Sequence, residues 1–354
     1  MATMKENLVN ADLTTTTQKV AIPTPQPGQL RIKVVVSGTN PKDWKIPQWI
    51  LKGPQNSGDD IAGIVDEVGE GVVGFKKGDR VGAFHEMMEP SGSFAEYAIS
   101  WARTTFHIPQ GTTFEEVATI PLAATTAGLA VYQRLRLPMP WQQAQKRTPL
   151  VVYGGASAVG AYAIKFASLA NVHPIIAIAG RGIPYVETLL DKSKGDKVID
   201  YREGEEHVIK ELQSIEPNDE GKVHAVDAVS EKGTVGQLAK MKAKDIQIAT
   251  VLDTTIKPEA LAELPEHVKI LFTQVGHVHR VYYPHLEKDV PFDKQFGAIL
   301  YPFISLGLQE GWFSGHPYEV APGGLEEGVQ VAMGKLSRGE VSAKKMLIRV
   351  ADDA

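Results

Sequence analysis

The sequence predicts an α/β protein of two domains, one rich in short strands and one built on a parallel sheet. Its 354 residues exceed one ordinary domain. Its first third alternates short apolar runs with glycine turns, a pattern typical of a compact β-barrel. The strand Leu150–Tyr153 then runs into a glycine-rich turn and an apolar helix at 161–169, which is the start of a βαβ unit.

The composition argues against several classes of protein. Cysteine is absent, which removes disulfides, thiolate catalysis and cysteine-ligated zinc. The formal net charge of −5 gives no basic surface for nucleic acid. No apolar run reaches the ~18 residues of a membrane span, and residues 1–12 lack the apolar core of a signal peptide. We therefore expect a cytoplasmic protein that binds neither nucleic acid nor membrane.

The β-rich first domain is expected to reach about residue 120. Strands are expected at residues 30–36, 61–68, 80–84 and 93–98, separated by glycine-containing turns. A helix is expected at 114–120, where Pro121 interrupts it, and another at 125–135, whose face is small and apolar.

Strands and helices alternate in the middle of the chain, as in a doubly wound sheet. Strands are expected at 174–179, 197–200, 223–229, 247–252 and 268–273, with helices at 184–194 and 205–215. A helix at 292–308, a helix at 323–334 and a strand at 345–350 follow.

The turn after residue 153 is a candidate seat for a diphosphate. It consists of small or apolar residues, namely Gly154, Gly155, Ala156, Ser157, Ala158, Val159 and Gly160. Glycine allows a tight turn and a close approach to a ligand, and the N–H groups of the first helical turn face an anion. Many strand–turn–helix units use glycine without a ligand, so the turn alone is weak support. The strand at 174–179 completes the βαβ unit on which dinucleotides bind.

The residues after that second strand indicate which dinucleotide binds. An NAD site normally has an acidic residue there for the ribose hydroxyls, whereas an NADP site omits it and supplies a cation. Here the strand is followed by Gly180, Arg181 and Gly182, with no acid before Glu187. Arg181 can form a forked contact with a 2′-phosphate. It could also be an ordinary surface cation, but the missing acid favours NADPH.

Seven motifs in this order resemble the medium-chain dehydrogenase/reductase superfamily, in its zinc-free quinone oxidoreductase and enoyl reductase branch. They lie at residues 40–45 (NPKDWK), 58–69 (GDDIAGIVDEVG), 77–81 (KGDRV), 92–97 (GSFAEY), 121–127 (PLAATTA), 154–160 (GGASAVG) and 200–202 (DYR). Residues 40–45, 125–129 and 153–160 are most similar to fungal stand-alone and trans-acting enoyl reductases. The resemblance implies a Rossmann cofactor domain (122–301) inserted into a β-rich GroES-like barrel domain (1–121 and 302–354).

The resemblance also implies catalytic residues. The lysine that ends the first motif lies at the active cleft in such enzymes, which corresponds to Lys45 here; on sequence alone, a surface lysine is the simpler interpretation. Thr126 matches a threonine beside the nicotinamide and the substrate. It could instead cap a helix or bond to the preceding turn, as threonine often does. Trp44 and Trp49 are expected in the core rather than as a platform for substrate.

Further cofactor contacts follow from the same resemblance. Asn40 is expected to shape its loop or to contact the cofactor ribose. Lys192 corresponds to a lysine near the adenosine phosphate, although this chain has a longer helix before it, which leaves that alignment uncertain. Tyr201 matches a tyrosine at the adenosine end, or is a half-buried residue at a strand end. At Gly180 relatives usually have serine, so one phosphate hydrogen bond is lost, for which Arg181 could compensate.

We expect no metal. Zinc-dependent relatives place cysteine and a His-Glu pair where this chain has residues 37–40 and Asp59-Asp60. His277 and His279 could ligate a metal, but two solvent-facing histidines are the simpler interpretation.

These observations predict an NADPH-dependent reductase of an activated C=C (enoyl or enone) or C=O bond. Without metal or thiol, the nicotinamide carries the hydride and the protein supplies orientation and polarisation. The substrate would be a small molecule or a polyketide-type chain, the latter carried by the acyl carrier domain of a synthase. Quinone or aldehyde reduction, or a non-catalytic NADPH-binding role, remain alternatives. The protein could be a monomer or a homodimer.

Overall fold

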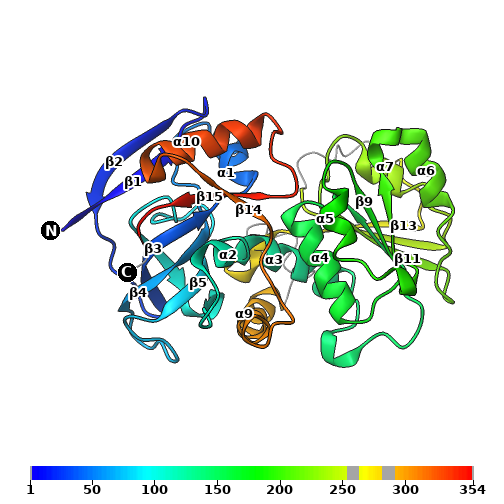
Figure 1. Ribbon diagram of the computed structural model, residues 1–354, viewed down its shortest axis with the longest axis horizontal. Coiled ribbons are helices and arrows are strands. Elements are labelled where there is room, and N and C mark those ends of the chain that lie inside the picture. Colours follow the sequence, from blue (N-terminus) through cyan, green and yellow to red (C-terminus); the bar gives the residue numbers. More distant parts are fainter. Residues whose placement is uncertain (1, 253–262, 281–291, 353–354) are drawn as a thin grey trace. The chain divides into compact units, whose positions relative to one another are not determined.

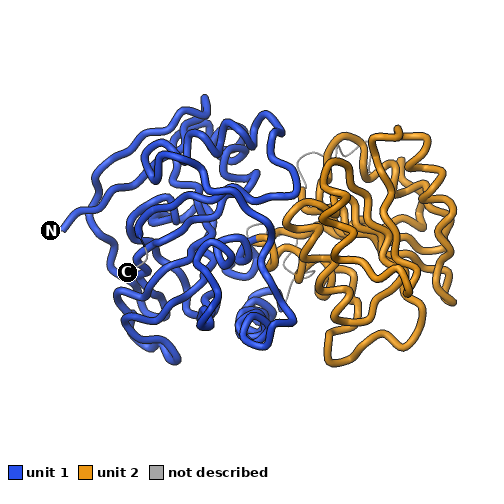
Figure 2. The backbone as a smooth tube through the Cα atoms, in the orientation of Figure 1, with its two compact units in different colours: residues 1–122, 276–354 blue, residues 123–275 orange. Residues whose placement is uncertain are grey.

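The computed structural model describes residues 2–252, 263–280 and 292–352. The chain divides into two compact units, Met1–Leu122 with Gly276–Ala354, and Ala123–Val275 (Figure 2). The first boundary lies one residue from the expected one. The second lies at 275/276 instead of 301/302, because helix α9 (Asp293–Glu310) packs on strand β7 (Thr105–His107) of the first unit.

The first unit is built on a seven-stranded sheet (Figure 1). Its strand order is β14-β15-β3-β4-β5-β7, and β6 pairs with β3. The long strand β3 forms antiparallel hydrogen-bonded pairs with both β4 and β6. The bounds of these strands are β3 Gln29–Gly38, β4 Asp60–Val68, β5 Arg80–Phe84, β6 Tyr97–Trp101, β14 Tyr318–Ala321 and β15 Lys345–Arg349.

An antiparallel hairpin of β1 (Thr3–Val9) and β2 (Thr15–Ala21) precedes this sheet and was not expected from the sequence. Strand β1 buries Met4 and Val9, and helix α10 (Gly324–Ser337) packs on it and on β15. Strand β2 is polar on both faces, so it lacks the alternation that identifies a strand.

Short helices of the first unit carry the 40–45 motif and its neighbours. Helix α1 spans Lys42–Lys45 and continues as a π-helical turn over Ile46–Leu51. Helix α2 spans Phe114–Ala118, and Thr113 caps it by accepting from the N–H of Glu116. Helix α3 spans Pro121–Gly128, so its first residues belong to the first unit and the rest to the second.

The second unit is a parallel six-stranded sheet in the order β10-β9-β8-β11-β12-β13. Strand β8 is central, and the order reverses beside it, which is where dinucleotides bind in such sheets. The strands are β8 Leu150–Tyr153, β9 Ile175–Ala179, β10 Lys197–Asp200, β11 Lys222–Asp227, β12 Asp245–Thr250 and β13 Val268–Phe272. The helices are α4 Ala158–Leu169, α5 Ile183–Glu187, α6 Glu205–Gln213 and α7 Thr234–Leu238.

Strands β8 and β9 of this unit are apolar along their length because both of their faces are buried. All five residues of β9 are buried, as are all four of β8, because helices cover both faces of a doubly wound sheet. A core cluster links Val151 and Ile178 of neighbouring strands to Leu212 of α6. These strands therefore lack the alternation of polar and apolar residues that is typical of a sheet with one exposed face.

Three expected elements differ from the structure. The strand expected at 93–98 begins only at Tyr97, because residues 93–96 bend and pair only through a single bridge between Ala95 and Glu6. The helix expected at 184–194 ends at Glu187, and a short 3₁₀ turn follows at Lys192–Lys194. The helix expected at 125–135 is α3 followed by a π-helical turn at Leu129–Arg134. Among the described residues, no helix is both long and apolar enough to cross a membrane.

Candidate functional site

The glycine-rich turn lies at the carboxyl end of β8, next to the turn after β11. Gly154 has φ +78°, and a Cβ built on it would lie 2.8 Å from Cγ2 of Val229. A Cβ on Gly160 would lie 2.3 Å from the carbonyl oxygen of Gly154. Only glycine fits either position, because the first needs a left-handed backbone and the second needs close packing of helix on strand.

Helix α4 begins directly behind this turn. Ser157 is its N-cap, and its side-chain oxygen accepts from the N–H of Gly160 at 3.1 Å. The N–H groups of Ala158 and Val159, in the same first turn, have no carbonyl within the helix to bond. Together with the positive end of the helix dipole, they suit an anion such as a diphosphate. The turn thus has the form expected of the seven residues Gly154–Gly160.

Strands β9 and β10 end side by side, with Ala179 paired to Asp200. Gly180 follows the first strand and Tyr201 the second. A Cβ on Gly180 would lie 2.5 Å from Cζ of Tyr201 and 2.6 Å from its hydroxyl oxygen. The Tyr201 ring, 48% exposed, therefore occupies the space that a serine side chain would need. Arg181 is exposed beside it, at the start of the turn that leads into α5.

Charges around this end of the sheet are mostly paired. Arg202 donates to both carboxylate oxygens of Asp200, at 2.6 to 3.1 Å. Those hydrogen bonds hold the pKa of Asp200 at about 2, so the strand-end acid stays ionised and neutralised. Lys192 lies 3.3 Å from Glu187 and is 75% exposed, on a turn beyond the short helix α5.

The loop after β11 lies beside the glycine-rich turn and was not expected from the sequence. Asp227 ends β11 directly opposite Tyr153, and it is fully buried. It accepts from the N–H of Ser230 at 2.8 Å and from the hydroxyl of Thr234 at 2.5 Å, which closes the loop that presses Val229 against Gly154. Burial raises the pKa of the Asp227 carboxyl. The only signal in the sequence was an acid that ends an apolar strand.

Lys45 ends helix α1 between two indole rings. Its Nζ lies 5.6 Å from the ring centroid of Trp44 and 5.1 Å from that of Trp49, and the two rings meet edge to face at 79°. Trp49 is 47% exposed, so its expected place in the core is wrong; the π-helical turn carries it outward. The two rings form a cation–π site that restricts the lysine ammonium.

The side chain of Asn40 is held by charged neighbours. Its amide nitrogen donates to Asp60 at 2.7 Å, and its amide oxygen accepts from Lys345 at 3.1 Å. Lys345 and Asp60 are themselves an ion pair at 2.6 Å, with side chains only 3% and 0% exposed. These contacts support the loop-shaping role expected of Asn40. A contact between the Asn40 side chain and the cofactor ribose would have to compete with these two hydrogen bonds.

A second, partly buried lysine pairs with the neighbouring acids. The ammonium of Lys42 contacts Asp59 and lies 2.8 Å from Asp43. Burial raises the pKa of Asp43 to about 7, despite the opposing attraction of Lys42. Burial by itself lowers the pKa of Lys42, but the two carboxylates outweigh it and raise that pKa above its ordinary value.

The Lys42–Asp59 and Lys345–Asp60 ion pairs bear on whether residues 37–40 and 59–60 could bind zinc, as the corresponding residues of zinc-dependent dehydrogenases do. Zinc prefers thiolate, imidazole and carboxylate ligands, and the site would need at least three. The two carboxylates here, Asp59 and Asp60, each already bind a lysine ammonium, which a divalent cation would have to displace. Among the described residues no group of three or more histidine, cysteine, aspartate or glutamate side chains could hold a metal. The donor set does not fit zinc.

His277 and His279 do not face solvent as expected; both are 3% exposed. The Nε2 of His279 lies 3.0 Å from the hydroxyl of Thr104, and burial lowers its pKa well below the ordinary value. Nδ1 of His277 lies 3.7 Å from a carboxylate oxygen of Asp293. Each is a core histidine on the 3₁₀ turn Val275–Val278 or directly after it.

Thr126 lies inside α3 and is 5% exposed. As the sixth residue of that helix it cannot be its N-cap, which removes one of the two structural alternatives. A bond to the preceding turn and a role beside the nicotinamide remain.

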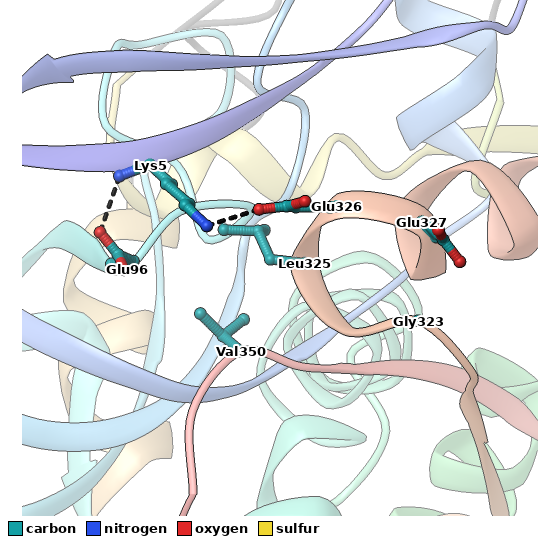
Figure 3. A pocket seen from close by; sticks show the side chains of 7 residues that line it. All are labelled: Lys5, Glu96, Gly323, Leu325, Glu326, Glu327 and Val350. Carbon is teal, nitrogen blue, oxygen red and sulfur yellow. Dashed lines mark hydrogen bonds and ion pairs between the residues drawn. The ribbon is translucent and has the colours of Figure 1, made fainter.

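Two cavities of the first unit are separate from the predicted site residues. One, of about 480 Å³, is lined by residues that include His85, Trp101 and Arg280. The other, of about 390 Å³, lies between β1 and the start of α10 (Figure 3). In it Lys5 pairs with Glu326 at 2.5 Å, and the backbone N–H of Lys5 donates to Glu96. Solvated charges line this cavity, which does not suit an apolar ligand.

Residues 26–110 match the alcohol dehydrogenase GroES-like domain. The chain is 43% identical over 327 residues to the trans-enoyl reductase fsr4 of Gibberella fujikuroi, covering 91% of this chain and 92% of that protein. It is 28% identical over 347 residues to the trans-enoyl reductase resD of Aspergillus sclerotiorum, covering 93% and 95%. The crystal structure of an alcohol dehydrogenase superfamily protein from Novosphingobium aromaticivorans has a TM-score of 0.75 at 24% identity, over 98% of this chain and 100% of that one.

Proposed function

The chain belongs to the trans-enoyl reductases of the medium-chain dehydrogenase/reductase superfamily, and on that premise we propose that it is an NADPH-dependent reductase of an activated C=C bond. The proposed substrate is an α,β-unsaturated carbonyl compound, such as an enoyl thioester of polyketide type. No metal takes part in the proposed reaction.

The observation that carries the proposal is the turn Gly154–Gly160 at the reversal of strand order. Its left-handed Gly154, its close-packed Gly160 and the capped α4 behind it suit a diphosphate. Arg181 and the missing acid after β9 favour the phosphorylated dinucleotide. Lys192 and Tyr201 are proposed contacts of the adenosine end, and the packing of Tyr201 on Gly180 supports this role for the tyrosine.

The reaction requires a donor for developing negative charge. Bound NADPH would supply the hydride, which adds to the β-carbon while the electron pair of the C=C bond moves toward the carbonyl oxygen. We assign stabilisation of that oxygen to the ammonium of Lys45, which the rings of Trp44 and Trp49 restrict, and to the hydroxyl of Thr126. A proton from a side chain or water then reaches the α-carbon and completes the reduction.

The chemistry of the available side chains supports metal independence. Asp59 and Asp60, at the positions of the relatives' His-Glu pair, are each paired with a lysine, partly buried Lys42 and buried Lys345 respectively. Positive charge is thus supplied by the chain's own ammonium groups.

The test is turnover of NADPH with three substrate panels, followed by the absorbance of the reduced nicotinamide. The panels are enoyl thioesters, enals with enones, and quinones with aldehydes. The proposal predicts oxidation with enoyl thioesters or enones and a loss of ~10²-fold or more in kcat for Lys45→Ala, with NADPH affinity retained. Turnover of only quinones or aldehydes would move the assignment to that class. NADPH binding without any turnover would indicate a non-catalytic protein.

We also propose that an acyl carrier domain of a synthase is the partner and that the protein is cytoplasmic. It would act as a monomer or a homodimer. If a synthase presents the substrate, a thioester on an acyl carrier domain will have a lower KM than the same acyl group on a small thiol. Equal KM values for both would count against a carrier domain.

A further inference from the structure

Lys345 places a buried positive charge where the first unit joins four segments. It is the first residue of the last strand, β15, and is 4% exposed. Its ammonium donates to Asp60 at 2.6 Å, to the amide oxygen of Asn40 at 3.1 Å and to the carbonyl of Thr119 at 3.4 Å. All three hydrogens of the ammonium therefore have acceptors, from β4, from the loop before α1 and from the turn before α3.

Asp60 is the counterpart of this ammonium and is equally saturated. One carboxylate oxygen accepts from Lys345 and from the amide of Asn40 at 2.7 Å. The other accepts from the N–H of Leu122 at 2.6 Å, in the first turn of α3. Because a buried ion needs such partners, the Lys345–Asp60 pair fixes every group that satisfies it.

Asn40 connects the buried ion pair to the helix that ends at Lys45. Its backbone N–H donates to the Asp43 carboxylate at 2.8 Å, and its carbonyl accepts from the N–H of Asp43 at 2.9 Å. This reciprocal pair sets the start of α1, whose last residue is Lys45. The side chain of Asn40 is thus fixed by Lys345 and Asp60, while its backbone fixes the helix.

We propose that Lys345 is a positioning residue for Lys45, acting through Asn40 and Asp60. This inference rests on the proposed function, in which Lys45 stabilises the substrate oxygen. The buried pair orders both the loop into α1 and the first turn of α3, the helix on which Thr126 lies four residues after Leu122. A buried lysine distant in sequence therefore acts on the reaction without touching the substrate.

The experiment uses the full chain with the neutral double substitution Lys345→Met/Asp60→Asn. Replacing both charges avoids leaving one buried ion unpaired, and Asn at position 60 can still accept from Leu122. The matched control is Lys335→Met, because Lys335 pairs with Glu319 at the same 2.6 Å but with side chains 34% and 39% exposed. Each protein is measured for thermal unfolding, NADPH affinity, kcat, KM and amide hydrogen exchange.

The proposal predicts that the double variant folds and binds NADPH within twofold of wild type. Amide exchange in residues 40–51 and 119–125 should rise at least tenfold, and kcat should fall at least tenfold. The Lys335→Met control should change neither. Lys345→Ala should regain part of the lost kcat with ethylammonium or propylammonium, which can enter the space left by the side chain.

Unchanged exchange in residues 40–51, or raised exchange with an unchanged kcat, would overturn the assignment. If the wild-type protein reduces no substrate, the proposed function fails by itself. Exchange then still decides whether Lys345 orders the Lys45 segment, so the two failures are distinguishable.

Discussion

The ring of Tyr201 lies against Gly180, with the tyrosine Cζ only 2.5 Å from where a Cβ of residue 180 would be. Strands β9 and β10 bring the two residues together, since Ala179 and Asp200 are paired immediately before them. A serine at position 180 could not coexist with the tyrosine in this orientation. The glycine and the position of the ring are therefore one feature.

This relationship predicts non-additive effects of substitution. Gly180→Ser should displace the exposed Tyr201 ring and weaken NADPH binding about fivefold, which is about 1 kcal/mol. In a Tyr201→Ala background the same serine should cost nothing or improve binding, because the space is then free. Binding titrations of the four proteins form a double-mutant cycle. Additive effects would show that the contact does not matter for the cofactor.

Arg181 is expected to read the 2′-phosphate. Arg181→Ala should weaken NADPH about tenfold, or about 1.4 kcal/mol, and leave NADH binding nearly unchanged. Lys210→Ala, which removes an exposed cation of α6, is the control and should affect neither. Equal losses for both dinucleotides would assign Arg181 to the diphosphate or to loop structure instead.

Much of the second unit could be predicted from the sequence, because its information is local. The glycine turn, the alternation of strands and helices and the absence of an acid after β9 are all properties of short segments. The early end of α5 was not predicted, since residues 184–194 contain helix formers. The helix ends at Glu187, and Asp191 caps a separate 3₁₀ turn further along the chain.

The contacts of the first unit could not be predicted, because they join residues far apart in sequence. Lys345 reaches Asn40 across 305 positions, and no periodicity marks a lysine at a strand start as buried. Trp49 was expected in the core because tryptophan is usually buried, but a π-helical turn exposes it beside Lys45. His277 and His279 were expected to face solvent but are buried, since their burial depends on tertiary packing against residues such as Thr104.

Trp49 should contribute to the reaction through Lys45. Lys45→Ala should lower kcat by ~10²-fold or more, as expected for removal of a group that stabilises charge or transfers a proton. Trp49→Leu should lower kcat only about three- to fivefold, because a partly exposed cation–π contact contributes ~0.5–1 kcal/mol. In Lys45→Ala the second substitution should have no further effect on kcat. An equal effect in both backgrounds would show that Trp49 acts on the substrate and not on the lysine.

Asp43 should make the protein less stable as pH rises. Its pKa is about 7 in the folded protein and near 3.8 when unfolded, so between these values the folded state holds the extra proton. The stabilisation is complete below about pH 4 and is lost as pH rises through 7. Asp43→Asn should remove this loss, on the order of 2–4 kcal/mol, from the difference in unfolding free energy between pH 5 and pH 8. Urea unfolding at the two pH values measures it, and an unchanged difference would contradict the buried, protonated carboxyl.

The most direct test of the account is a parallel titration of the protein with NADPH and NADH, followed by fluorescence of the bound nicotinamide. We expect saturable binding of NADPH, at least tenfold tighter than that of NADH, and loss of that preference in Arg181→Ala. No binding of either dinucleotide, or tighter binding of NADH, would contradict it.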